Sequence, residues 1–198
     1  VLSRKPEYVY QIEKERAGSY QIEVLAKSKE HEVPITLRFQ ELRDEQMQPA
    51  HGELPFFLQE NTVIQFLQYP YEQVVAENFV EILEKMELIN DLSCYEEIYG
   101  ILKKEALDGR KAEQQIIEVG TKRELFFGKD RLDTVLRYKD YTYMKRKWTA
   151  YLKRERKKEP DWVEVMTLLE AFFPPVWRAI IRDEIFIGDW MPELCRFL

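Results

Sequence analysis

Residues 69–86 read YPYEQVVAENFVEILEKM, and the period of the hydrophobic pattern changes at this stretch. After Pro70 the apolar residues recur three and four positions apart, which is the spacing of one face of an α-helix. Proline is well tolerated at the start of a helix, so a helix beginning just after Pro70 is expected. The stretch therefore divides the chain into two parts of different character. The apolar residues of the repeat are Val74, Val75, Phe79, Ile82, Leu83 and Met86.

Before residue 69 the apolar and polar residues alternate with the period of two that is typical of β-strands. Segments 8–12 and 20–25 flank a polar stretch that contains Gly18, a residue that readily takes the positive φ of a turn. These segments predict a β-hairpin. Further strands are predicted at 33–39 and 62–67, and a long loop at 43–60. Connections this short or irregular favour a mostly antiparallel sheet.

After residue 70 the helical period continues almost to the end of the chain. Asn90 and Asp91 are predicted to cap a second helix that runs through Leu102. Further helices are predicted at 111–119, 130–158, 162–172 and 176–186, followed by a tail from Gly188. The predicted fold class is therefore α+β, with a small, mostly antiparallel sheet at residues 1–69 and a helical bundle at 70–198.

Composition excludes several function classes. The 198 residues contain 30 Lys and Arg, 36 Asp and Glu, two His and two Cys. So few histidines and cysteines argue against zinc modules and classical hydrolase triads. The sequence also lacks three motifs that would indicate a function: a P-loop, the glycine motif of dinucleotide-binding domains and a sequence-specific DNA-binding motif. No apolar run approaches the roughly 20 residues of a membrane span, so no membrane association is expected. The only two cysteines lie far apart in the sequence and have no metal-binding spacing, which favours a reducing, cytoplasmic setting.

The strongest charge asymmetry lies in the predicted long helix. Residues 137–158 hold ten Lys and Arg against two acids, and tyrosines and Trp148 are interleaved with them. Cations attract phosphates and aromatic rings stack on bases, so the segment predicts nucleic-acid binding. Two alternatives remain open: a solvated helix face whose aromatic side is buried, and a surface for an acidic protein partner. The cations expected to grip a nucleic-acid backbone are Lys145, Arg146, Lys147, Lys153 and Arg154.

Three segments carry a resemblance to a known family: YPYEQVVAENF at 69–79, Asn90-Asp91, and EEIYGIL at 96–102. Together with the pattern of Trp148, the segment 162–173 and Pro174-Pro175, they resemble the AbiEii family of nucleotidyltransferase-like toxins. The resemblance covers about residues 60–182. It implies a nucleotidyltransferase-type sheet, NTP and Mg²⁺ as cofactors, transfer of a nucleotide to RNA such as tRNA, and pairing with an antitoxin protein.

The resemblance assigns roles to individual positions. Asn78 stands where the family has a lysine that touches phosphate, and Lys85 is a substitute on the same helix. Asp91 and Glu97 take the places of the acids of the second helix. Glu7 is the candidate metal-binding carboxylate, although the neighbouring Lys5 would repel a metal ion.

Two hypotheses follow. The first is an AbiEii-like nucleotidyltransferase toxin of a bacterial toxin–antitoxin or phage-defence system. The second is a catalytically silent relative that binds nucleic acid or protein through the basic helix, and it is favoured by the loss of the lysine at Asn78.

Overall fold

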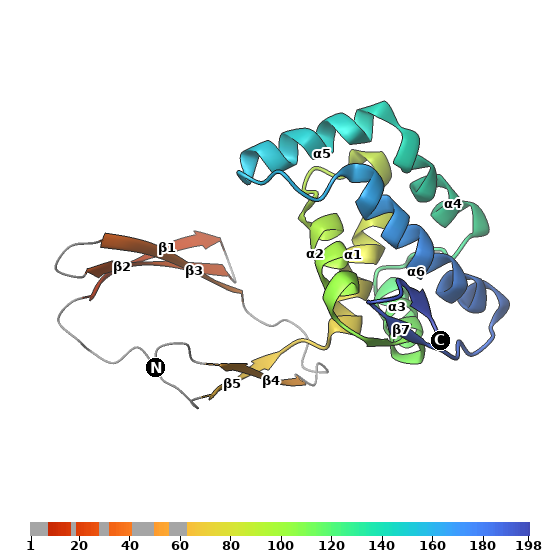
Figure 1. Cartoon of the computed structure of the whole chain (residues 1–198), viewed down its shortest axis with the longest axis horizontal. Helices are drawn as coiled ribbons and strands as arrows, with labels where there is room; N and C mark the ends of the chain where they lie inside the picture. Colours follow the sequence, from red (N-terminus) through yellow and green to blue (C-terminus); the bar gives the residue numbers. More distant parts are fainter. Residues whose placement is uncertain (1–7, 17–18, 28–31, 41–49, 56–62) are drawn as a thin grey trace. The chain divides into compact units, whose positions relative to one another are not determined.

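The computed structural model describes residues 8–16, 19–27, 32–40, 50–55 and 63–198 (Figure 1). The chain forms two compact units, residues 1–48 and 49–198. The first unit contains β1 (Tyr8–Arg16), β2 (Ser19–Lys27) and β3 (Glu32–Gln40), which form an antiparallel sheet in the order β1-β2-β3. Ile12 lies opposite Ile22, and Ile22 lies opposite Leu37. The predicted hairpin and third strand are confirmed.

The second unit begins with an antiparallel hairpin of β4 (Ala50–Pro55) and β5 (Val63–Gln68). β5 is the predicted fourth strand, but it pairs with β4 and not with the first sheet. Prediction of one continuous loop over 43–60 was wrong, because β4 lies within it. The strand tolerates Gly52 because the ring of Phe66, its partner in the register, packs where a side chain would stand. A large cross-strand neighbour can compensate for a glycine in this way.

The helices occupy the C-terminal part, so the mixed α+β class with antiparallel sheets before the helices is confirmed (Figure 1). The change of period near residue 69 coincides with the step from β5 to α1. The helical elements are α1 (Tyr71–Lys85), η1 (Met86–Leu88), α2 (Ser93–Lys104), α3 (Gly109–Lys122), α4 (Lys129–Arg137), η2 (Tyr138–Asp140), α5 (Thr142–Arg154) and α6 (Trp162–Arg182). A small antiparallel sheet, which the sequence did not predict, joins β6 (Leu107–Asp108), β7 (Asp189–Met191) and β8 (Arg196–Phe197).

The single helix predicted over 130–158 was wrong. The chain leaves helical geometry at Tyr141, whose φ of −80° and ψ of 111° are those of extended backbone. Tertiary contacts hold this break: Tyr138 is buried, and its carbonyl accepts a 2.8 Å hydrogen bond from the Trp162 indole. Packing of distant residues therefore overrides a continuous local pattern.

Prediction of two helices at 162–172 and 176–186 was also wrong, because α6 is one helix that contains Pro174 and Pro175. Prolines lack an amide hydrogen, so two main-chain hydrogen bonds are missing in the middle of α6. Phe172 and Phe173 before the prolines are fully buried, and Trp177 after them is nearly so. The buried apolar face thus continues across the prolines and holds both halves of α6 against the core.

Aromatic side chains fill the core of the helical unit. Phe79 of α1 stacks on Phe173 of α6 with ring centroids 3.6 Å apart, and the Trp177 ring lies edge-on to Phe79. Trp148 packs between Tyr151 and Trp162. Large rings bury much apolar area, so these contacts fix α1 and α5 against α6.

Candidate functional site

Asn78 on α1 and Glu97 on α2 lie in direct contact. The amide nitrogen Nδ2 of Asn78 donates to Oε2 of Glu97 at 2.9 Å and to the carbonyl of Val74 at 2.9 Å. The two residues are 19 positions apart in sequence, and the packing of α1 on α2 brings them together. An amide group has two N–H donors, so both donors of Asn78 are engaged within the protein.

No family model, curated protein or solved structure matches this chain. The AbiEii resemblance therefore stays a prediction. What the candidate residues can do follows from their own contacts and distances. Within the described residues, no helix has the length and apolar character that crossing a membrane requires.

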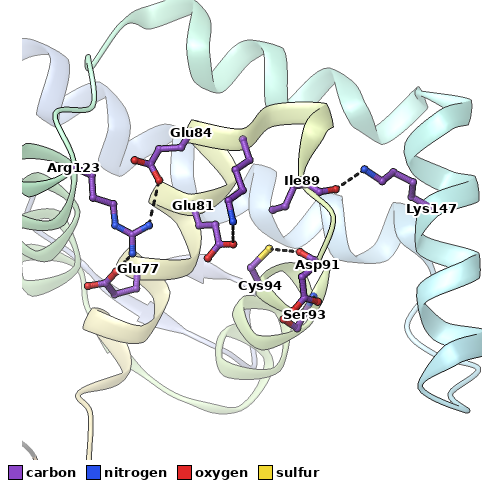
Figure 2. A network of polar contacts seen from close by, with 10 residues as sticks. Glu77, Glu81, Glu84, Ile89, Asp91, Ser93, Cys94, Arg123 and Lys147 are labelled. Carbon is purple, nitrogen blue, oxygen red and sulfur yellow. Dashed lines mark hydrogen bonds and ion pairs between the residues drawn. The ribbon is translucent and has the colours of Figure 1, made fainter. Parts of the chain in front are cut away.

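Lys85 lies further along α1 and takes no part in the Asn78–Glu97 contact. Its ammonium donates to Glu81 at 2.6 Å, and this hydrogen bond raises the pKa of Lys85. On the neighbouring turns, Arg123 of α3 bridges Glu77 and Glu84 (Figure 2). Glu77, Glu81 and Glu84 of α1 are thus paired with cations, and Lys85 takes part in this row of ion pairs.

Asp91 precedes α2 and points toward α5. Its carboxylate accepts the main-chain N–H of Ser93 at 3.1 Å and lies 3.8 Å from Nη2 of Arg154. Asp91 thus braces the start of α2, although the structure places the formal N-cap at Leu92. The thiol of Cys94 hydrogen-bonds the Asp91 carbonyl (Figure 2), and burial raises the pKa of this cysteine. A buried protonated thiol is a packing group and not a nucleophile.

The described residues do not supply a magnesium site. Among them, no three His, Cys, Asp or Glu side chains converge closely enough to hold a metal ion. Glu7, the candidate metal ligand, lies outside the described residues. Asp91 and Glu97 each have other partners, so these two acids do not form a pair of metal ligands.

Part of the basic segment is held against the connection between α1 and α2 and against the first turn of α2. The ammonium of Lys147 donates to the carbonyl of Glu87 at 3.1 Å and to the carbonyl of Ile89 (Figure 2). Lys157 donates to Glu96 at 2.5 Å. Arg154 pairs with Glu155 at 2.8 Å as well as approaching Asp91. Lys147, which was predicted to hold RNA, has its ammonium on two main-chain carbonyls and thereby anchors α5.

Two tyrosine hydroxyls, which are uncharged donors, also hold the basic segment against η1 and α2. The Tyr138 hydroxyl donates to Glu87 at 2.7 Å, which lowers the pKa of that carboxyl. The Tyr151 hydroxyl donates to Glu96 at 2.5 Å. The sequence did not indicate Glu87 and Glu96 as partners of the basic segment. Their partners Tyr138 and Tyr151 lie more than 50 positions away, so no local spacing could have shown these contacts.

The outward side of α5 carries the remaining cations. Arg146 and Lys153 are exposed and form no ion pair with any described residue, whereas Lys145 lies 3.9 Å from Asp140. Tyr141 and Tyr143 are about half exposed beside them, with ring centroids 6.2 Å apart. Trp148, Tyr138 and Tyr151 are buried. The basic segment thus has an inner, structural side and an outer, accessible side.

Replacing Lys147 with methionine is expected to lower the free energy of unfolding of the helical unit by about 2 kcal/mol, because the two carbonyls lose a charged donor. All four tryptophans lie between residues 148 and 190, so fluorescence during urea unfolding reports this unit. Lys153→Met is the matched control and should be close to neutral. Equal losses in both variants would contradict the anchoring role.

Proposed function

We propose that this chain is an AbiEii-like nucleotidyltransferase that transfers a nucleotide from an NTP to RNA, with tRNA as the acceptor class, in the bacterial cytoplasm and paired with an antitoxin. The contact between Asn78 and Glu97 carries the proposal. These positions were assigned separately through the resemblance, from two different segments, and they meet at hydrogen-bonding distance. NTP and Mg²⁺ enter the proposal through the resemblance alone, since the described residues do not form the metal site.

In this proposal α1 and α2 position a polar pair beside the substrate phosphates. A lysine at position 78 would place a cation next to the Glu97 carboxylate and supply positive charge to a phosphate. The Asn78 amide carries no charge and both of its N–H donors are engaged by Val74 and Glu97, so phosphate binding at this position is weaker than with a lysine. The outer side of α5, with Arg146, Lys153 and the exposed tyrosines, would hold the RNA backbone and its unpaired bases.

A second function is favoured by one specific observation. Both N–H donors of Asn78 are already engaged by Val74 and Glu97, which leaves this amide no free donor for a phosphate. In this second function the chain is a catalytically silent relative that binds nucleic acid or an acidic protein through α5.

Asn78→Lys distinguishes the two functions. Protein, Mg²⁺, labelled NTPs and total tRNA are incubated, and label in RNA is measured. For an enzyme we expect label with the natural chain and a rate at least about tenfold higher with Asn78→Lys, because a charged contact to phosphate is restored. Gln114→Lys adds the same charge on the exposed surface of α3 and should leave the rate unchanged.

Glu97→Ala completes the experiment and should remove the label. If neither the natural chain nor Asn78→Lys labels RNA, the transferase proposal fails. RNA binding that persists in that case and weakens steeply with salt would identify the silent binding protein.

A further inference from the structure

A cavity of about 390 Å³ lies between α4 and α6, outside the sites described above. Its volume is within the range of pockets that hold small organic ligands, which is roughly 300–1,000 Å³. The floor is apolar and includes the buried side chains of Leu132 and Trp177 together with Pro174. The exposed side chain of Ile181 extends this apolar lining toward solvent.

The charged lining of the cavity is mostly positive. Lys129, Arg178 and Arg182 line it against a single acid, Asp133. Lys129 and Arg178 form no ion pair with any residue in the described part of the chain, and Arg182 is only 3.9 Å from the exposed Glu184. This lack of partners differs from the inner side of α5, where cations are matched with acids and carbonyls. The net positive lining favours an anionic ligand.

Trp177 provides an independent observation. It is 3% exposed, and its indole Nε1 is one of three buried side-chain polar atoms without a hydrogen-bond partner in the described residues. Trp148, Trp162 and Trp190 each donate to a main-chain carbonyl at 2.8 Å. The Trp177 indole is thus the exception among the four tryptophans, because its N–H is shielded from solvent and has no acceptor among the described residues.

We propose that this cavity binds a nucleoside monophosphate unit. Its phosphate, which carries nearly two negative charges, would be held by Arg178, Lys129 and Arg182, and guanidinium groups suit phosphate oxygens because they form paired hydrogen bonds. Its flat base would lie on the apolar part of the lining, which Leu132, Pro174 and Trp177 form. The unit belongs either to a free nucleotide or to the end of an RNA strand. This site does not rest on nucleotide transfer, and its test leaves Asn78 and Glu97 unchanged.

The test is a titration of ¹⁵N-labelled protein with AMP, with affinity measured by calorimetry. We expect AMP to shift the indole N–H resonance of Trp177, and adenosine and inorganic phosphate each to bind at least about tenfold more weakly than AMP, since each makes only part of the contacts. Arg178→Glu should weaken AMP binding by at least about tenfold. Lys104→Glu, an exposed charge reversal at the end of α2, should leave the affinity unchanged.

Two further arms make the result decisive. Arg178→Gln removes the charge without reversing it and should also weaken binding, which separates lost contacts from altered folding. A 5′-phosphorylated RNA hexanucleotide that competes with AMP would identify a strand end as the source of the unit, and lack of competition would identify the free nucleotide. Three results would overturn the proposal. These are a Trp177 resonance that AMP does not shift, an equal loss of AMP affinity in Arg178→Glu and Lys104→Glu, and inorganic phosphate that binds as tightly as AMP.

Discussion

Replacing Trp190 with alanine is expected to lower the free energy of unfolding of the helical unit by about 4 kcal/mol, because a large buried ring is removed and a cavity remains. Trp190 is fully buried on β7, with the rings of Phe172 and Phe197 at 5.2 and 5.3 Å. Its indole donates to the carbonyl of Leu102 at 2.8 Å, near the end of α2. Carbonyls in the last turn of a helix lack a partner within the helix, so this donor completes α2.

Trp190→Phe separates the two contributions. It keeps an aromatic ring in the core and removes the indole donor, so a smaller loss of about 1–2 kcal/mol is expected. Urea unfolding followed by the fluorescence of the three remaining tryptophans measures both variants. A loss below about 1 kcal/mol for Trp190→Ala would show that the C-terminal sheet does not contribute to the core.

If RNA binds the outer side of α5 as proposed, the double substitution Arg146→Glu with Lys153→Glu is expected to weaken RNA binding by about a hundredfold at low salt, because two cations that would face phosphates become repulsive. Neither residue has an ion-pair partner among the described residues, and both are exposed. The substitutions should therefore leave the stability of the fold nearly unchanged. The slope of log affinity against log salt concentration should fall by about one for each lost phosphate contact.

Lys104→Glu with Arg110→Glu is the matched control, since it reverses the same number of exposed charges on α2 and α3. Binding to tRNA is measured by filter retention over a range of salt concentrations. If the control weakens binding as much as the α5 variant does, RNA responds to net charge and the outer side of α5 is not its surface. Lys147 is left out of the experiment because its substitution would disturb the anchor of α5.

Local sequence patterns predicted much of the fold. The change of period after Pro70 located α1, and the alternation around Gly18 located the first hairpin. Prediction failed where distant contacts decide the local backbone. The break at Tyr141 is held by Trp162, and α6 continues through its prolines because both halves share one buried face. β4 was missed because its Gly52 is compensated by Phe66, a partner on another strand.

The candidate residues assigned through the resemblance do not all meet: Lys85 pairs with Glu81, and Asp91 lies near Arg154. The Asn78 and Glu97 positions were selected from sequence, and the structure places them in contact. The ten cations of 137–158 predicted a basic surface for nucleic acid, but Lys147 and Arg154 reach back to the connection between α1 and α2, and Lys157 reaches the first turn of α2. Which cation is anchored depends on acceptors far away in sequence, and the local pattern holds no information about them.

The proline pair divides α6 into two halves that meet where two main-chain hydrogen bonds are missing. The half after the prolines carries Arg178 and Arg182 at the cavity between α4 and α6, whereas the half before them carries Glu164, which pairs with Tyr99 and Lys103 of α2. A helix bends most easily where its main-chain hydrogen bonds are interrupted. The two arginines of the cavity and the contact of Glu164 with α2 therefore lie on opposite sides of the point at which α6 bends most easily.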